Sequence, residues 1–76
     1  MPPKKFKPIT EEELRSSVGA RLRSLRGDMA LEKVAKGARV AARGYFAIEN
    51  GKASSNLRTL MRLANFYSLK VRELLP

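Results

Sequence analysis

Apolar residues recur at every third or fourth position along most of this chain, in short runs that glycine, asparagine or proline interrupts. This spacing lines one face of an α-helix, whereas a half-buried β-strand would alternate apolar and polar residues. No stretch of the sequence shows that alternation, and no internal repeat is present. The pattern therefore predicts an all-α fold built from short helices.

The first helix is expected to begin after Thr10 and to end at Gly27. Thr10 and Glu13 have the spacing of a capping box, and Ile9 can pack on Leu14 as a hydrophobic staple. Gly27 readily adopts the positive φ that often ends a helix. The apolar face of this helix would consist of Leu14, Val18, Leu22 and Leu25.

Two short helices joined by a tight turn should follow. Asp28 is the best available cap for the first of them, and Gly37 should weaken its last turn. The second spans Ala41 to Glu49, and Asn50-Gly51 ends it because both residues tolerate positive φ. The inward residues of the pair would be Met29, Leu31, Val34, Ala35, Ala38, Tyr45 and Ile48.

Asn56 should cap a fourth helix, and a last short helix should end at Pro76. The buried stripe of the fourth helix would consist of Leu57, Leu60, Leu63, Ala64 and Tyr67, and the apolar residues of the last helix are Val71, Leu74 and Leu75. The whole sequence thus predicts a compact bundle of about five short helices.

A length of 76 residues leaves room for a single domain. Residues 1–9 are rich in proline and lysine, and we expect them to form a flexible basic arm, with residues 10–76 as the folded domain. Lys4, Lys5 and Lys7 of this arm would either enter a minor groove of DNA or remain a solvated tail.

The chain contains no cysteine and no histidine. This excludes disulfides and zinc sites and removes the commonest general base, while no serine or lysine has a visible activating partner. We therefore expect no enzymatic activity, no metal and no cofactor. No apolar run approaches the roughly 18–20 residues of a membrane span, and the first residues lack the apolar stretch of a signal peptide, which predicts a cytoplasmic protein without a membrane partner.

Sixteen Lys and Arg residues against seven Asp and Glu residues give the chain a net charge of +9. Such a charge favours a polyanionic partner, above all nucleic acid. A cationic membrane-surface peptide or a nonspecific nucleoid protein would need only this charge and amphipathic helices. The two central helices favour specific DNA binding over these alternatives. They are short and joined by a tight turn, and the second is basic with small side chains. In such a pair the first helix braces the second, which can lie in the major groove.

Several motifs occur in order along the chain, namely Val18-Gly-Ala-Arg-Leu-Arg-Ser-Leu-Arg26, Val34-Ala35, Ile48-Glu-Asn-Gly-Lys52, Asn56-Leu-Arg-Thr-Leu60, Leu63-Ala64 and Val71-Arg-Glu-Leu-Leu75. In these motifs the chain resembles the phage-repressor (Cro and lambda-repressor) or XRE-type helix-turn-helix family. The resemblance implies a lambda-repressor-like fold with its helix-turn-helix from Leu31 to Asn50. It implies a bacterial or phage transcription regulator, such as a repressor, that binds double-stranded DNA at the nucleoid. An antitoxin or adaptor whose helix-turn-helix mainly serves a protein partner is the alternative.

The resemblance places the recognition helix at about residues 41–49. Arg43 could grip guanine O6 and N7 with two parallel hydrogen bonds, worth about 1–3 kcal/mol of discrimination, whereas Phe46 could contact the groove or pack into the core. The residues expected to contact bases are Ala42, Arg43, Phe46 and Ala47. Those expected to contact phosphates are Lys33, Lys36, Arg39, Gly51, Lys52 and Arg58. Arg26 is expected to pair with Glu49, and Ala35 to let the two central helices approach closely.

Four features depart from the family pattern. Arg39 stands where the family usually has glycine, so the turn is either strained at Arg39 or rebuilt with the help of Gly37. Ala41 replaces the usual Ser or Thr cap, and Leu31 replaces a glutamine that touches DNA in relatives. The connection between the first two helices is also about two residues shorter than the common form.

One domain offers a single recognition helix, so useful specificity normally comes from two domains on half-sites about 34 Å apart. We therefore expect a homodimer. The apolar C-terminal residues are the surface predicted for pairing, namely Phe66, Tyr67, Leu69, Val71 and Leu74.

Overall fold

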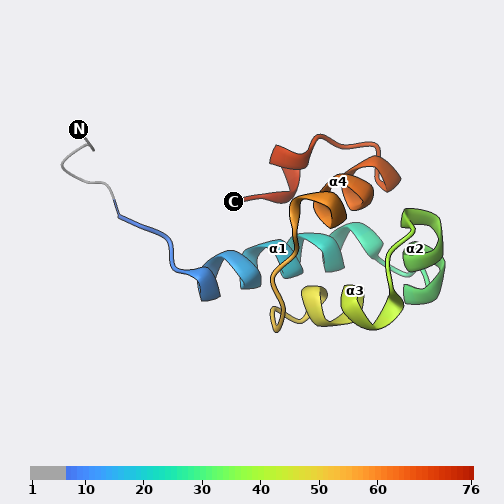
Figure 1. Cartoon of the computed structure of the whole chain (residues 1–76), viewed down its shortest axis with the longest axis horizontal. Coiled ribbons are helices and arrows are strands. Elements are labelled where there is room, and N and C mark those ends of the chain that lie inside the picture. Colours follow the sequence, from blue (N-terminus) through green and yellow to red (C-terminus); the bar gives the residue numbers. More distant parts are fainter. Residues whose placement is uncertain (1–6) are drawn as a thin grey trace.

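A computed structural model describes residues 7–76 of the chain, and these residues form four α-helices and one 3-10 helix (Figure 1). The elements are α1 (Glu11–Arg26), α2 (Leu31–Ala38), α3 (Ala42–Glu49), α4 (Leu57–Phe66) and the 3-10 helix η1 (Val71–Leu74). The predicted all-α fold is confirmed. Most of the predicted basic arm, including Lys4 and Lys5, lies outside the described residues, and residues 7–9 are exposed and irregular.

The two ends of α1 form as the sequence predicts. The Thr10 hydroxyl accepts a hydrogen bond from the Glu13 amide at 3.1 Å, and the Glu13 carboxylate accepts one from the Thr10 amide at 3.3 Å. At the other end Gly27 has φ 53° and donates its amide to the Arg23 carbonyl at 3.1 Å. Both ends of the longest helix are therefore set by local chemistry.

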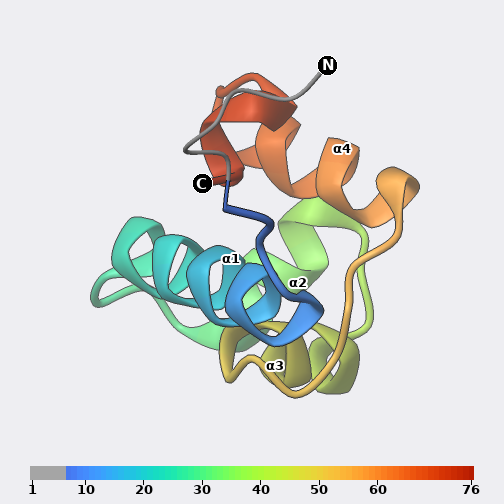
Figure 2. The same cartoon turned by 90° about the vertical axis from the view of Figure 1, so that its left-hand side faces the viewer.

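One apolar core joins all five elements. α1 lies alongside α3, α2 contacts both α3 and α4, and η1 packs on α4 and α1 (Figures 1 and 2). The core consists of Val18 and Leu22 of α1, Val34 and Ala38 of α2, Tyr45 and Ile48 of α3, Leu60, Leu63 and Ala64 of α4, and Leu74 of η1.

Among the predictions about apolar residues, one is wrong and another fails for one of its residues. Leu57 was expected in the buried stripe of α4, but it is 80% exposed, whereas Leu60 in the same turn is buried. Of the C-terminal residues predicted as the pairing surface, only Leu74 is excluded from it, while the other four keep part of their surface exposed. Leu74 is fully buried, and Phe66, Tyr67, Leu69 and Val71 pack against the core.

Glycines allow two pairs of helices to approach closely. A Cβ atom on Gly19 of α1 would lie 2.6 Å from the carbonyl oxygens of both Ile48 and Glu49 in α3. A Cβ atom on Gly37 of α2 would overlap the ring of Phe66 in α4. Gly37 thus makes room for an aromatic ring, in addition to its expected weakening of the last turn of α2.

The turn between α2 and α3 is strained rather than rebuilt. Arg39 adopts the left-handed conformation, with φ 62° and ψ 43°, and its amide donates to the Lys36 carbonyl at 3.2 Å. The next amide, that of Val40, donates to the Ala35 carbonyl at 2.9 Å. This is the bonding that glycine normally supports at the end of a helix, and here an arginine adopts it.

The predicted cap of α2 is wrong. The N-cap position is occupied by Ala30, which has no side-chain hydrogen bond to offer, and Asp28 lies two residues earlier. The short connection after α1 forms a tight turn in which the Met29 amide donates to the Arg26 carbonyl at 3.0 Å. That turn places Ala30 rather than Asp28 at the start of the helix, so α2 relies on its packing.

Candidate nucleic-acid interface

α3 has one buried face and one accessible face. Tyr45, Ile48 and Glu49 face the interior. On the other side Arg43 is exposed and Phe46 is 57% exposed, so Phe46 does not belong to the core. Ala42 and Ala47 are half-buried. All four residues predicted to contact bases therefore keep accessible surface, while the opposite face of α3 packs against the rest of the domain.

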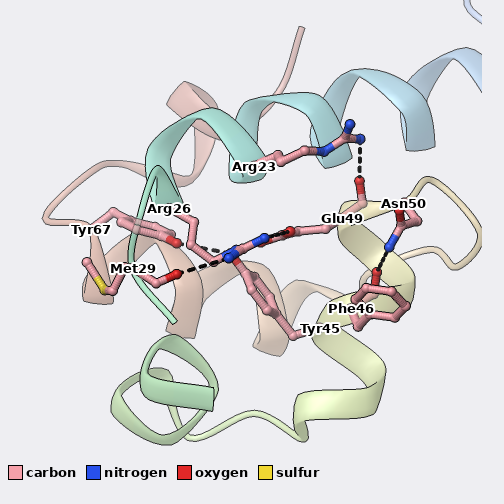
Figure 3. Close-up of polar contacts among 8 residues, drawn as sticks. All are labelled: Arg23, Arg26, Met29, Tyr45, Phe46, Glu49, Asn50 and Tyr67. Atoms are coloured by element: carbon pink, nitrogen blue, oxygen red, sulfur yellow. Dashed lines mark hydrogen bonds and ion pairs between the residues drawn. The ribbon is translucent and has the colours of Figure 1, made fainter. Parts of the chain in front are cut away.

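The carboxyl end of α3 is held by an ion pair with α1. Arg26 donates from Nε to Oε2 of Glu49 at 2.7 Å and from Nη2 to Oε1 at 3.0 Å, so the pair is bidentate (Figure 3). Glu49 is only 2% exposed. Arg26 also donates from Nη1 to the Met29 carbonyl at 2.9 Å. This single guanidinium therefore joins α1, the turn before α2 and the end of α3.

The ion pair keeps Glu49 charged despite its burial. Burial by itself would raise the pKa of Glu49, but the hydrogen bonds from Arg26, helped by the Tyr45 hydroxyl and the charge of Arg23, lower that pKa below its ordinary value. The hydrogen bond to Glu49 in turn raises the pKa of Arg26. Both groups are therefore ionised at neutral pH, and α3 is tied to α1 by full charges.

Two further arginines of α1 bind main-chain carbonyls where α3 ends. Arg23 donates from Nη2 to the Glu49 carbonyl at 2.9 Å (Figure 3), and Arg15 donates from Nε to the Gly51 carbonyl at 3.2 Å. Sequence reasoning missed these contacts. A signal was present, because Arg15, Gly19 and Arg23 are spaced four apart and so lie on one face of α1, with the glycine between two donors.

A pair of tyrosines links α3 to the end of α4. The hydroxyl groups of Tyr45 and Tyr67 lie 3.0 Å apart and share a hydrogen bond (Figure 3). The ring of Tyr67 also meets Phe66 edge to face, with centroids 5.1 Å apart. Burial raises the pKa of both tyrosines, so they stay neutral in the folded domain. This contact fixes the middle of α3 from the side of α4.

The amino end of α3 lacks comparable support. Its N-cap is Ala41, which makes no side-chain hydrogen bond, as the departure from the family pattern predicts. The strained residue Arg39 lies just before it, and the Arg39 carbonyl accepts a hydrogen bond from Nη1 of Arg62 at 3.1 Å. Sequence reasoning missed Arg62, whose spacing of four from Arg58 places both on one side of α4.

The residues predicted to contact phosphates come from the segments around α3. Lys33 and Lys36 are exposed on α2, and Lys52 is exposed in the loop after α3. Gly51 has φ 70° in the same loop and is half-buried. Arg39 and Arg58 are exposed in the turn before α3 and in the first turn of α4. Exposed cations thus precede and follow α3 along the chain.

Within residues 7–76, no group of three or more acidic or histidine side chains is arranged to hold a metal ion. No helix in that part of the chain is both long enough and apolar enough to cross a lipid bilayer.

Comparisons with known proteins agree with this geometry. A family model described as helix-turn-helix matches residues 22–74. The restriction-modification controller protein C.AhdI from Aeromonas hydrophila has a similar structure, with a TM-score of 0.73 and 26% identity over 79% of this chain and 94% of that one. The DNA-binding domain of BldD has a TM-score of 0.72 and 32% identity over 86% of this chain and 97% of that one. No curated protein sequence matches the chain.

Proposed function

The chain belongs to the helix-turn-helix family of Cro and lambda-repressor type, a family of DNA-binding domains rather than enzymes, and from this premise we propose that it is a transcription regulator that reads a specific sequence in double-stranded DNA. The observation that carries the proposal is the two-sided character of α3. One side is bonded to α1 and α4, while Arg43 and Phe46 on the other are exposed. A helix held in this way can enter a major groove without losing its own support.

In this proposal Arg43 reads bases. It lies in the first turn of α3, the part of a recognition helix that reaches deepest into the groove. A bidentate contact with guanine is worth about 1–3 kcal/mol of discrimination against other bases. Phe46, Ala42 and Ala47 offer apolar surface that suits thymine methyl groups.

The cations around α3 position the domain on the DNA backbone. These residues are Lys33, Lys36, Arg39, Lys52 and Arg58, together with the backbone amide of Gly51. Contacts to phosphates carry no sequence information, and each neutralised phosphate changes the logarithmic salt dependence of binding by about 0.9. The regulator acts as a repressor in the cytoplasm when its bound site overlaps a promoter.

Two variants test the division between base and phosphate contacts. Arg43→Ala should reduce the preference for the selected sequence over random duplex by about tenfold or more. Lys52→Ala should weaken binding to all sequences about equally. Arg72→Ala, which removes the same charge from η1, is the control. Sites selected from a random DNA pool supply the specific duplex, and an Arg43 variant with unchanged preference would contradict the assignment.

We further propose that two copies bind adjacent half-sites as a homodimer. The whole of α3 is only eight residues long, so its accessible face covers only a few base pairs. Two such helices on half-sites about 34 Å apart would double the base contacts. Sedimentation of the full chain, free and on DNA carrying two half-sites, tests this step, and monomers under both conditions would contradict it.

A further inference from the structure

One side of α4 faces the end of α2 and the turn that follows it. Arg58, Arg62 and Phe66 are spaced four residues apart and therefore lie on one side of α4. Gly37 of α2 has no Cβ atom to overlap the ring of Phe66, so the two helices approach closely there. Arg62 lies one turn before Phe66 and lines, with Arg39, a cleft beside this contact. The side chain of Arg62 is thus held close to the turn between α2 and α3.

The peptide unit between Arg39 and Val40 is bonded on both sides. Its amide, that of Val40, donates to the Ala35 carbonyl at 2.9 Å, and its carbonyl, that of Arg39, accepts from Nη1 of Arg62 at 3.1 Å. The amide and the carbonyl of one peptide unit lie in one plane, so the two bonds fix the orientation of that plane. This orientation sets ψ of Arg39 and φ of Val40, the torsions through which the chain leaves α2. We call this pair of bonds the turn lock.

The charge of Arg62 also suits this position. The last carbonyls of α2 carry the negative end of the helix dipole, and a cation near them is favourable. Arg62 is half-buried, whereas Arg58, one turn earlier, is exposed. A hydrogen bond from a charged donor is stronger than a neutral one, and partial burial reduces its screening by solvent. Arg62 therefore acts as a C-terminal cap of α2 that another helix supplies.

Side chains reach the turn and the first residues of α3 by hydrogen bonding at a single point. In residues 7–76, the bond from Arg62 is the only hydrogen bond between a side chain and residues 39–44. The carboxyl end of α3 is instead bonded to α1 through two arginines. Arg43 lies in the first turn of α3, four residues after Arg39. The direction in which Arg43 leaves the domain therefore depends on a turn that Arg62 holds.

We propose that Arg62 is a positioning residue for base readout, because the turn lock sets the direction in which Arg43 enters the major groove. Arg62 touches no base in this proposal and acts only through Arg43. The proposal rests on the proposed function in one respect, since it requires Arg43 to contact bases. It goes beyond that function because α4 then contributes to sequence preference without reaching the groove.

The first test is Arg62→Met, studied as the full chain on the selected duplex and on random duplex. Methionine keeps an apolar stem but lacks the donor and the charge. The preference for the selected sequence should fall by about fivefold, less than in Arg43→Ala, because Arg43 is misdirected rather than removed. Arg62→Lys retains a cationic donor and should keep more of the preference. A folded Arg62→Met variant with the preference of wild type overturns the proposal.

Arg58→Met is the matched control, because it removes the same groups one turn earlier on the same side of α4. Arg58 is a proposed phosphate contact, so this variant should weaken binding to all sequences equally and lower the logarithmic salt dependence by about 0.9. If Arg62→Met shows this pattern instead of a loss of preference, Arg62 contacts a phosphate and the positioning role is wrong.

A double variant shows whether Arg62 acts through Arg43. In the Arg43→Ala background, Arg62→Met should cause no further loss of preference, because the side chain that it directs is absent. An equal loss in both backgrounds would mean that Arg62 affects recognition by another route, which contradicts the proposal.

Amide hydrogen exchange without DNA tests the turn lock by itself. Arg62→Met should speed exchange of the Val40 amide by at least about fivefold more than that of Leu22, a fully buried residue of α1 whose exchange reports opening of the whole domain. Equal acceleration at both amides would indicate only a general loss of stability and would overturn the turn lock.

These measurements separate the positioning role from the proposed function. If Arg43→Ala lowers the sequence preference but Arg62→Met changes neither the preference nor exchange at Val40, base readout by Arg43 stands and the positioning role fails. If Arg43→Ala leaves the preference unchanged while Arg62→Met speeds exchange at Val40, the assignment of base readout to Arg43 fails. Arg62 then holds the turn without a part in readout, which also overturns the proposal.

Discussion

The two ends of α3 differ sharply in how the protein supports them. At the carboxyl end, Glu49 is buried and paired with Arg26, and Gly19 lets the backbones of α1 and α3 approach. At the amino end, Ala41 makes no side-chain cap, and the preceding turn passes through the left-handed residue Arg39. The fold is thus secured at one end of the recognition helix, and the proposed base contacts lie toward the other.

This difference separates stability from sequence recognition. Contacts at the carboxyl end involve main-chain carbonyls and buried charges, so almost any substitution there disturbs the packing of α1 on α3. Side chains at the amino end, such as Arg43, project from the surface and can change without touching the core. A regulator built in this way can acquire a new DNA sequence preference at little cost to its fold.

The largest expected effect tests the carboxyl end directly. Gly19→Ala should destabilise the domain by about 1–3 kcal/mol, because the new Cβ atom meets two backbone carbonyls that cannot turn aside. The measurement is urea unfolding followed by circular dichroism. Gly44→Ala in α3 is the matched control, since its Cβ has no neighbour closer than 4.0 Å, and it should stabilise the helix by about 0.5–1 kcal/mol. Equal effects at both glycines would show that the close approach of α1 and α3 at Gly19 does not stabilise the carboxyl end of α3.

The second effect concerns the buried charge. Glu49→Gln should lower the free energy of unfolding at pH 7 by about 1–2 kcal/mol, because charge-assisted hydrogen bonds become neutral ones. The pKa of Glu49 is lower in the folded state, so its contribution is complete above its ordinary value of 4.5 and is lost as the pH falls from there through the folded pKa.

Urea unfolding of wild type and variant as a function of pH measures this contribution. The difference between the two should shrink as the pH falls below 4.5. Glu32→Gln, at an exposed position of α2, removes the same charge outside the ion pair and is the control. A constant difference across the acid range would mean that the ion pair does not stabilise the carboxyl end.

The third expected effect is a gain in stability from a substitution just before the amino end of α3. Arg39→Gly should stabilise the domain by about 0.5–1 kcal/mol, since relief of the left-handed strain exceeds the extra entropy that glycine gives to the unfolded chain. Arg43→Gly, at an exposed position with ordinary helical backbone, should instead destabilise by about 0.5–1 kcal/mol. Thermal and urea unfolding check both. Loss of stability in Arg39→Gly would show that the turn carries no strain.

The smallest expected effect also concerns the weak support of the amino end of α3. Ala41→Ser should stabilise the domain by about 0.5 kcal/mol, because a serine hydroxyl can accept a hydrogen bond from an otherwise free amide of α3. Removal of an existing cap in Asn56→Ala should have the opposite sign, since the Asn56 side chain accepts from the Thr59 amide at 2.8 Å. If Ala41→Ser leaves the unfolding midpoint unchanged, the amide groups at the amino end of α3 already have other hydrogen-bond partners.

Local chemistry accounts for most of what could be predicted about the fold. The cap at Thr10, the stop at Gly27 and the cap at Asn56 each involve groups only a few residues apart, so the sequence contains both partners of every bond. The prediction that Asp28 caps α2 was wrong because the tight turn after α1 determines which residue occupies the N-cap position of α2. The resemblance, rather than spacing, indicated the pair of Arg26 and Glu49.

The sequence by itself determined that this chain is a bundle of short helices with a basic helix-turn-helix at its centre, because helical periodicity, caps and charge are local or additive properties. Only the tertiary structure decided how α3 is held. Arg15 and Arg23 find their carbonyls, and Gly19 its close contact, across more than twenty residues of sequence. It also decided that Leu57 is exposed while Leu74 is buried, since two equally apolar side chains differ only in whether another helix covers them.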